Sequence, residues 1–242
     1  MSTFKNANTK VIGFFGQSGS GKTTIIKGLP SIVAGTPIIQ ETGTIRKLFS
    51  KNPTSYKNPA EFIEQKEQIM GEGNPGSLIA QMYEKYIRSQ FQLLNDFSTE
   101  VFLTVREPAT SKNFILFDRC PLDFHVLTEC GVSHLMAEFG GKMNKTHNLF
   151  LGLAKKTAIE NTMKFFDAIF IVKPWEAPNT SNINMFNDGV RDQYLNNHYV
   201  GNNWYGRLDG LDLGQTKVFY VDETHVSIES RVKLVTDKMK EI

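Results

Sequence analysis

The stretch Gly13–Thr24, GFFGQSGSGKTT, decides the fold of this chain. Within it, Gly16–Thr23 fits the pattern G-x-x-x-x-G-K-[ST] at every specified position. The apolar run Lys10–Phe15 precedes the pattern and suits a buried strand, and KTTIIKGL follows it and suits a helix that ends before Pro30. A strand, a glycine-rich turn and a helix in this order form a loop whose backbone N–H groups surround a phosphate, with the positive end of the helix dipole beside it. The sequence therefore predicts that the chain binds a nucleoside triphosphate.

Each position of the loop has an expected role in holding the triphosphate. In this pattern the lysine, Lys22, reaches the β- and γ-phosphate oxygens, and the hydroxyl of Thr23 binds Mg²⁺. ATP and Mg²⁺ are the expected cofactors. The predicted binding set is Gly16, Gln17, Ser18, Gly19, Ser20, Gly21, Lys22, Thr23 and Thr24.

Four further apolar runs suit buried strands and are separated by segments with helical spacing. They are Thr36–Glu41, Asn113–Asp118, Asp167–Pro174 and Thr216–Glu223. The longest amphipathic segment is Ser77–Phe97, whereas Glu100–Val105 fits either a continuation of that helix or a strand. Strands that alternate with helices favour a parallel sheet. We therefore predict an α/β fold, a P-loop NTPase three-layer sandwich with a five-stranded parallel sheet, helices on both faces and a lid segment.

Length, composition and charge narrow the class of protein. The 242 residues suit one domain over 1–242, with a lid-like insertion at about 175–212 in the long polar stretch after the fourth strand. No apolar run approaches the roughly 18–20 residues that span a bilayer, so we expect no membrane partner. The net charge of +2 argues against a strongly basic nucleic-acid wrapper but leaves a local basic cleft open. With only 2 cysteines we expect free thiols in a cytoplasmic protein, not a secreted disulfide framework.

The fate of the bound phosphate distinguishes a switch, a motor and a kinase. A GTP-binding switch needs D-x-x-G, which the sequence lacks, and N-K-x-D, where NKTH at Asn144 lacks the aspartate. A motor ATPase needs an acidic pair at the end of an apolar strand, and VFYVDE supplies Asp222 and Glu223. Since this run lies close to Ile242, we expect little room for sensor elements after it and interpret it as the last core strand. A nucleic-acid-associated ATPase that uses Asp222 and Glu223 remains the alternative from a different class.

A kinase needs an acceptor pocket that faces the γ-phosphate. In open α/β sheets, ligands bind beyond the carboxyl ends of the strands. Glu41 follows the second predicted strand, Asp118 and Arg119 follow the third, and Arg191 lies in the long loop after the fourth. Phosphoryl transfer requires in-line positioning, Mg²⁺ and cations on the equatorial oxygens, and these charged residues match those requirements.

Four motifs in this order, GQSGSGKTT, IIQETGTIR, FDRCPLD and NDGVRD, resemble those of the P-loop nucleoside and nucleotide kinases. The chain is especially similar to the group around the ribosylnicotinamide kinase domain, with thymidylate and deoxynucleoside kinases as more distant relatives. The resemblance spans most of the chain, but only the loop motif is highly specific. It implies an ATP- and Mg²⁺-dependent kinase with a mobile lid.

The resemblance also implies roles for residues beyond Lys22. Glu41 would act as the base or orient the acceptor hydroxyl. Asp118 would serve Mg²⁺, directly or through water, or that hydroxyl, and Arg119 would bind donor or acceptor phosphate. Arg191 in the lid would be the transition-state cation. The further candidates are Arg46 for an acceptor phosphate, Asp123 as a capping or orienting group, and Asp188 in the lid motif.

Two other patterns receive the simpler interpretation. TVREPAT, which contains Arg106, is similar to the substrate-binding stretch of thymidylate kinases, but it precedes the third strand instead of following the second, so Arg106 stays a weak candidate. Cys120, His125, Cys130 and His134 have spacings that do not bring all four onto one helical face, so we expect thiols and ordinary histidines instead of a zinc site.

The sequence thus predicts a kinase that transfers the γ-phosphoryl group of ATP to a small-molecule acceptor: a nucleoside, a nucleoside monophosphate or a related base–sugar compound. The alternative is a viral-type DNA-modification kinase, with DNA as its substrate, that phosphorylates a hydroxymethylated base such as 5-hydroxymethyluracil. Tyr199, Trp204 and Tyr205 would either stack on a base or pack in the core. The sequence also leaves a homodimer open.

Overall fold

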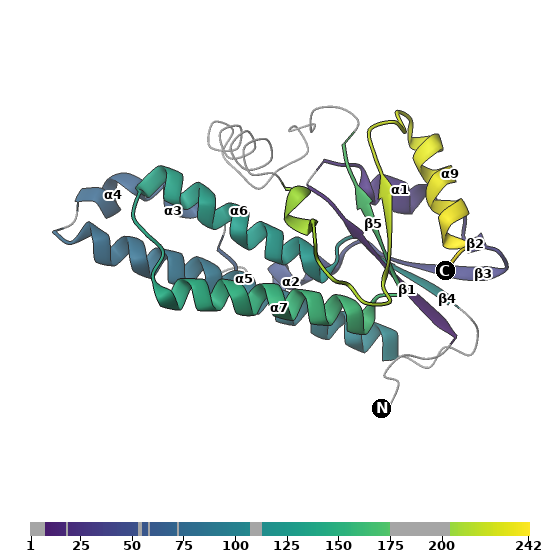
Figure 1. Ribbon diagram of the computed structural model, residues 1–242, viewed down its shortest axis with the longest axis horizontal. Coiled ribbons are helices and arrows are strands. Elements are labelled where there is room, and N and C mark those ends of the chain that lie inside the picture. The colour runs from purple at the N-terminus through teal and green to yellow at the C-terminus, as the bar shows by residue number, and fades with distance from the viewer. Residues whose placement is uncertain are drawn as a thin grey trace.

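The computed structural model describes residues 8–17, 19–52, 55–57, 59–71, 73–106, 113–174 and 204–242. Its strands are β1 (Thr9–Phe15), β2 (Ile32–Val33), β3 (Thr36–Glu41), β4 (Asn113–Phe117), β5 (Ala168–Val172) and β6 (Lys217–Val221). They form one 6-stranded sheet in the order β2-β3-β4-β1-β5-β6 (Figure 1). The chain is therefore an α/β protein with β1, the strand that leads into the glycine-rich loop, in the interior of the sheet.

All five predicted strands are present and run parallel, but the predicted strand count is wrong. The sixth strand is β2, which pairs antiparallel with β3. The turn between them uses Ala34 and Gly35, both with positive φ (49° and 79°), and a two-residue strand of this kind has too little sequence to form a recognisable pattern. The prediction that Thr36–Glu41 is a buried strand is also wrong, because Ile39 is 40% exposed. β3 is paired on both sides, but its only neighbour toward the edge of the sheet is the two-residue strand β2.

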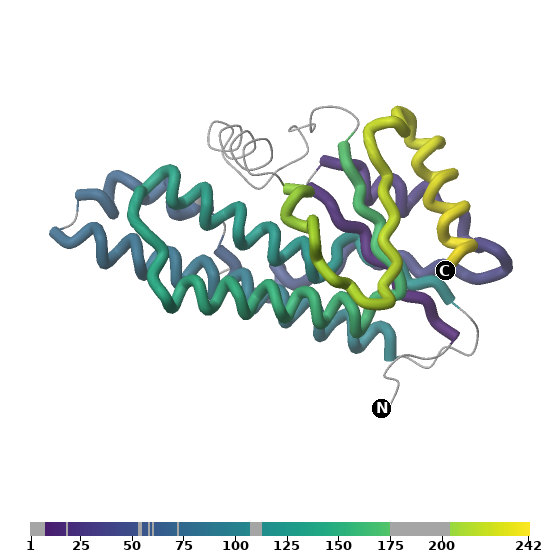
Figure 2. The backbone as a smooth tube through the Cα atoms, in the orientation of Figure 1, coloured from purple at the N-terminus to yellow at the C-terminus, as the bar shows by residue number. Residues whose placement is uncertain are grey.

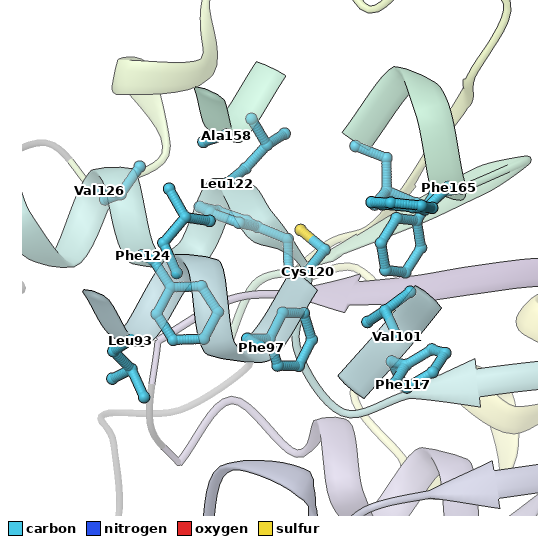
Figure 3. Close-up of a cluster of buried hydrophobic side chains, with 14 of the residues drawn as sticks. Leu93, Phe97, Val101, Phe117, Cys120, Leu122, Phe124, Val126, Ala158 and Phe165 are labelled. Carbon is cyan, nitrogen blue, oxygen red and sulfur yellow. The ribbon is translucent and has the colours of Figure 1, made fainter. Parts of the chain in front are cut away.

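Helices pack on both faces of the sheet. On one face, α1 (Lys22–Gly28) and α9 (Ile228–Met239) bury Ile25, Ile26, Val235 and Met239 against β1, β4 and β5. On the other face lie α5 (Pro75–Arg106), α6 (Pro121–Phe139) and α7 (Lys145–Phe165). Figure 3 shows the core of this second face, where side chains of α5, α6 and α7 meet Phe117 of β4. The predicted covering of both faces is thus confirmed.

A helical part extends beyond one end of the sheet (Figures 1 and 2). Here α5 and α6 share a separate core with Phe62 of α3 (Pro59–Ile63), including Met82, Tyr86 and Leu135. The short helices α2 (Thr44–Lys51), α4 (Lys66–Gly71) and η3 (Gly206–Leu208) complete the described elements. The predicted helix Ser77–Phe97 lies inside the longer α5, and the ambiguous run Glu100–Val105 is helical.

Close packing between β1 and α6 fixes the position of the candidate site. A Cβ atom added at Gly13 of β1 would lie 2.7 Å from Cβ of Cys120, which precedes α6. Glycine therefore lets the start of α6 approach the strand that leads into the loop. On the other flank, Phe14, Phe170 and Phe219 stack across β1, β5 and β6, with centroid separations of 5.3 Å and 5.1 Å.

None of the helices in the described ranges is long and apolar enough to cross a membrane.

Candidate active site

The glycine-rich loop connects β1 to α1 at the carboxyl end of the sheet. Gly16, Gly19 and Gly21 have positive φ angles of 156°, 80° and 89°. A Cβ atom at Gly16 would lie 2.5 Å from the carbonyl oxygen of Val172 at the end of β5. The strained conformation and the close approach together explain why glycine is required at this position. Ser18 lies outside the described residues.

Lys22, the first residue of α1, points its ammonium group at the loop. Its Nζ donates hydrogen bonds to the carbonyl oxygens of Gly16 and Gln17, both at 2.7 Å, and to Oγ of Ser20 at 3.4 Å. The side chain is buried, and burial lowers the pKa of Lys22 from 10.5 to about 7. The positive charge of Arg119 adds to this shift, whereas the carboxylates of Asp118 and Asp123 oppose it. The structure therefore places the predicted phosphate-binding cation in the loop, and burial brings the pKa of this lysine close to neutral pH.

Thr23 and Asp118 meet across two neighbouring strands. The Thr23 hydroxyl donates a hydrogen bond to Oδ2 of Asp118, which follows β4 directly. β4 pairs with β1, and Gly13 lies opposite Phe117 in the register, so the two side chains approach because their strands are adjacent. A hydroxyl and a carboxylate in contact with each other offer hard oxygen ligands of the kind that Mg²⁺ prefers. Thr24 lies next to this pair on α1 and is exposed.

Arg119 and Asp123 hold both backbone polar groups of Gly16. The Gly16 N–H donates to Oδ1 of Asp123 at 3.2 Å, and its carbonyl accepts from Nη1 of Arg119 at 2.9 Å. The two side chains also form an ion pair at 2.9 Å, with Asp123 completely buried. Oδ2 of Asp123 accepts the Cys120 N–H at 2.9 Å, which caps α6 as predicted. Arg119 thus lies against the loop, and Asp123 in the first turn of α6 holds the loop through Gly16.

Tyr205 contacts the same loop from the C-terminal part of the chain. Its hydroxyl donates to the Val172 carbonyl at 2.8 Å and accepts the Gln17 N–H at 3.5 Å, and its ring packs edge-on against Phe15. Trp204 is buried in the core. Arg207 forms an ion pair with Glu129 of α6, which fixes this segment to the helical face. Packing is therefore the observed role of Trp204 and Tyr205, and the sequence offered no pattern that placed Tyr205 beside the loop.

Glu41 lies beside Asp118 at the end of the neighbouring strand. The Asp118 N–H donates to the Glu41 carbonyl at 3.2 Å, and Glu41 is opposite Phe117 in the β3–β4 register. Its side chain is half-exposed, and no group in the described ranges donates a hydrogen bond to its carboxylate. Arg46 is exposed on α2. The structure thus brings Glu41, Asp118 and Thr23 to the carboxyl ends of β3, β4 and β1, as predicted.

The predicted lid falls almost entirely on residues that the structure does not describe. Asp188, Arg191 and Tyr199 lie outside the described residues, as does most of the segment at about 175–212. Arg106 is described, and it is an exposed residue at the end of α5.

The acidic pair after β6 has a local structural role. The Asp222 carboxylate accepts hydrogen bonds from the Thr224 N–H at 3.1 Å and the Thr224 hydroxyl at 2.5 Å, and it lies 3.1 Å from Nδ1 of His225. These contacts lower the pKa of Asp222, chiefly through the Thr224 hydroxyl. Asp222 therefore closes a turn between β6 and α9, and Glu223 is exposed beside it.

The cysteines and histidines in and just before α6 are buried in the core. Cys120 and Cys130 are buried free thiols, and burial raises the pKa of both, that of Cys130 to about 11. Burial likewise lowers the pKa values of His125 and His134. Across the part of the chain that the structure describes, no three His, Cys, Asp or Glu side chains form a group that could hold a metal ion.

Arg231 of α9 makes a contact with the loop that no sequence pattern indicated. It is fully buried, and its Nη1 lies 3.4 Å from the carbonyl oxygen of Ser20. Its spacing of four residues from Val235 and eight from Met239 places Arg231 on the buried face of α9, but nothing in the local sequence indicates the contact with the loop.

No protein-family model matches this chain, and no curated protein sequence is significantly similar to it. The case for any function therefore rests on the geometry of the site.

Proposed function

We propose that this chain is an ATP- and Mg²⁺-dependent phosphotransferase of the P-loop kinase type. Its acceptor would be a nucleoside, a nucleoside monophosphate or a related base–sugar compound. The observation that carries the proposal is the convergence of Lys22, Thr23 and Asp118 at the carboxyl ends of β1 and β4, which are adjacent parallel strands. The five parallel strands, with the loop after the interior strand β1, support the classification as a P-loop fold.

Lys22 would bind the terminal phosphates of ATP. Among the described residues, its ammonium group donates to uncharged acceptors, the carbonyl oxygens of Gly16 and Gln17 and the hydroxyl of Ser20. Phosphate oxygens carry full negative charge and accept stronger hydrogen bonds from a cation. The bound phosphate would therefore replace these acceptors and stabilise the charged form of the lysine during transfer.

Thr23 and Asp118 fit a magnesium ion that is also bound by phosphates. Mg²⁺ in nucleotide sites takes one or two protein oxygens, and completes its shell with waters and substrate phosphates. The hydroxyl of Thr23 and the carboxylate of Asp118 supply two such oxygens in direct contact with each other. When bound, the ion would neutralise phosphate charge, and the two side chains would fix its position relative to Lys22.

Glu41 is suited to the acceptor side of the reaction. It lies at the end of β3, one strand further from β1 than Asp118, and its carboxylate accepts no hydrogen bond from the described residues. A carboxylate in this position would orient an acceptor hydroxyl toward the γ-phosphate or accept its proton. In a kinase of this type, Arg119 and Arg191 would supply positive charge to the transferring phosphoryl group.

The contacts of Asp222 argue against the ATPase alternative. A motor ATPase would need this carboxylate to hold Mg²⁺ or to activate water, but it is hydrogen bonded within its own turn to Thr224. Replacing Asp222 with alanine should therefore leave phosphoryl transfer close to its normal rate. A loss of turnover with ATP binding retained would favour the ATPase.

The experiment that tests the proposal follows the γ-phosphate of labelled ATP. Acceptors should include nucleosides, nucleoside monophosphates, ribosylnicotinamide, plain DNA and DNA that contains 5-hydroxymethyluracil. We expect label on an acceptor with the wild type and with Lys27→Ala, a control on the exposed side of α1, but none with Lys22→Ala. Label on the modified DNA alone would identify the DNA-modification kinase. Label found only as free phosphate, and released faster with nucleic acid, would refute the kinase proposal.

A further inference from the structure

A buried arginine of the last helix supports the glycine-rich loop from behind. Arg231 has no exposed surface, and its guanidinium donates to carbonyl oxygens in three other segments. The acceptors are Lys173 after β5 at 2.7 Å, Asp222 after β6 at 3.0 Å, His225 at 2.7 Å and, in the loop itself, Ser20 at 3.4 Å. One side chain therefore joins the loop to the ends of β5 and β6 and to α9.

The Ser20 carbonyl oxygen that Arg231 contacts belongs to the peptide group that also carries the Gly21 N–H. The structure has no cis peptide bond in the described ranges, so the Ser20 carbonyl and the Gly21 N–H point in opposite directions. Since the carbonyl faces Arg231, the Gly21 N–H faces away from α9. Gly21 has φ of 89°, a conformation that turns successive N–H groups of a loop toward a common anion.

We propose that Arg231 is a positioning residue for the phosphate-binding loop, which acts through the Ser20–Gly21 peptide to aim the Gly21 N–H at the phosphate. This inference rests on the proposed triphosphate site, because it assigns how that site is kept in its binding conformation. Arg231 does not touch the ligand. Its guanidinium holds the carbonyl away from the anion, and without it the peptide can rotate and present a carbonyl oxygen to a phosphate.

Burial of Arg231 is consistent with a role beyond packing. Burial lowers the pKa of Arg231, because the charged guanidinium loses favourable hydration when it leaves water. Apolar packing of α9 is already supplied by Val235, which is also fully buried and belongs to the core that contains Ile25 and Ile26 of α1. The two residues lie one turn apart on α9, so Val235 offers a matched control for damage to this interface.

The test compares stability with affinity for phosphate in Arg231→Met, Arg231→Lys and Val235→Ala. Unfolding in urea measures stability, and calorimetric titration with ATP and with inorganic tripolyphosphate measures binding. The amide resonance of Gly21 in nitrogen-15 NMR spectra reports the orientation of the peptide. We expect Arg231→Met to lower the affinity for both ligands about tenfold, as for the loss of one hydrogen bond from a charged donor. The variant should also shift the Gly21 resonance. Val235→Ala should lower stability and leave affinity unchanged.

Arg231→Lys keeps the experiment decisive where the methionine variant does not fold. Lysine retains the charge, but it carries its donors on a single atom and cannot reach all four carbonyls. We expect a folded protein with affinity between those of the wild type and Arg231→Met. Wild-type affinity and an unshifted Gly21 resonance in folded Arg231→Lys would overturn the inference and leave the proposed function intact. A wild-type protein that binds neither ATP nor tripolyphosphate would overturn the proposed function, and the inference with it.

Discussion

Binding of ATP should make the protein take up a proton at pH 8. Burial holds the pKa of Lys22 at about 7, so roughly one tenth of the free protein carries the charged lysine at pH 8. Phosphate favours the charged form strongly, which brings the bound lysine close to full protonation. The difference is about 0.9 proton per nucleotide, and Mg²⁺–ATP is itself fully ionised at this pH.

Calorimetric titration measures this uptake directly. The observed binding enthalpy is plotted against the ionisation enthalpy of several buffers at pH 8, and the slope gives the number of protons exchanged. An independent check is the affinity itself, which should fall about tenfold between pH 8 and pH 9 because less of the free protein is already charged. The Lys27→Ala control should reproduce both results, since Lys27 is exposed at the end of α1.

The wild-type protein can refute this prediction without any variant. Tight binding with a slope near zero at pH 8 would show that Lys22 is charged in the free protein. The three loop acceptors would then compensate its burial, and the reasoning from desolvation would be wrong. A residual uptake in Lys22→Met, if that variant still binds, would assign the proton to another group.

Three further predictions concern the same site. The pKa of Lys22 in the folded protein lies below its unfolded value of 10.5, so the unfolded chain binds more protons between pH 7 and pH 10.5. The free energy of unfolding should therefore rise with pH across this window, by at most about 5 kcal/mol. Urea titrations of Lys22→Met should no longer show this rise. Asp118→Asn should raise the Mg²⁺ concentration for half-maximal transfer about tenfold or more; an unchanged Mg²⁺ dependence would remove Asp118 from the metal site. Asp123→Ala should lower the free energy of unfolding by about 3 kcal/mol, because it leaves Arg119 and the Gly16 N–H without their buried partner; a loss under about 1 kcal/mol in urea unfolding would contradict this.

The parts of the fold that depend on short stretches of sequence were predictable. The five parallel strands follow from apolar runs, and the loop follows from a pattern that also predicts which side chains would face a phosphate. The strand order was not predictable, because it depends on which runs pair across long intervening helices. β2 was missed because two residues form no pattern, and β3 was expected to be buried because its sequence, TPIIQE, does not show that it lies near an edge.

The candidate site divides in the same way. Lys22, Thr23 and Asp118 were predicted and are found together, since each lies directly after a recognisable strand or within the loop motif. The contacts of Tyr205 and Arg231 with the loop were not predicted. Tyr205 is 188 residues from the loop position that it contacts, and Arg231 is 211 residues away from Ser20. Contacts over such separations depend on the tertiary fold and leave no periodicity in the sequence.

The shape of the loop is consequently not a property of the glycine-rich motif alone. Glycines permit its positive φ angles, but they permit many other conformations equally well. Here the Gly16 peptide is held from one face of the sheet by Asp123 and Arg119, and the Ser20 carbonyl is held from the other face by Arg231. α6 and α9 each contribute one buried charged side chain that is hydrogen bonded to the loop, Asp123 and Arg231 respectively. Under the proposed function, the motif would supply the donors for a phosphate, and the two helices would keep those donors in the arrangement that binds it.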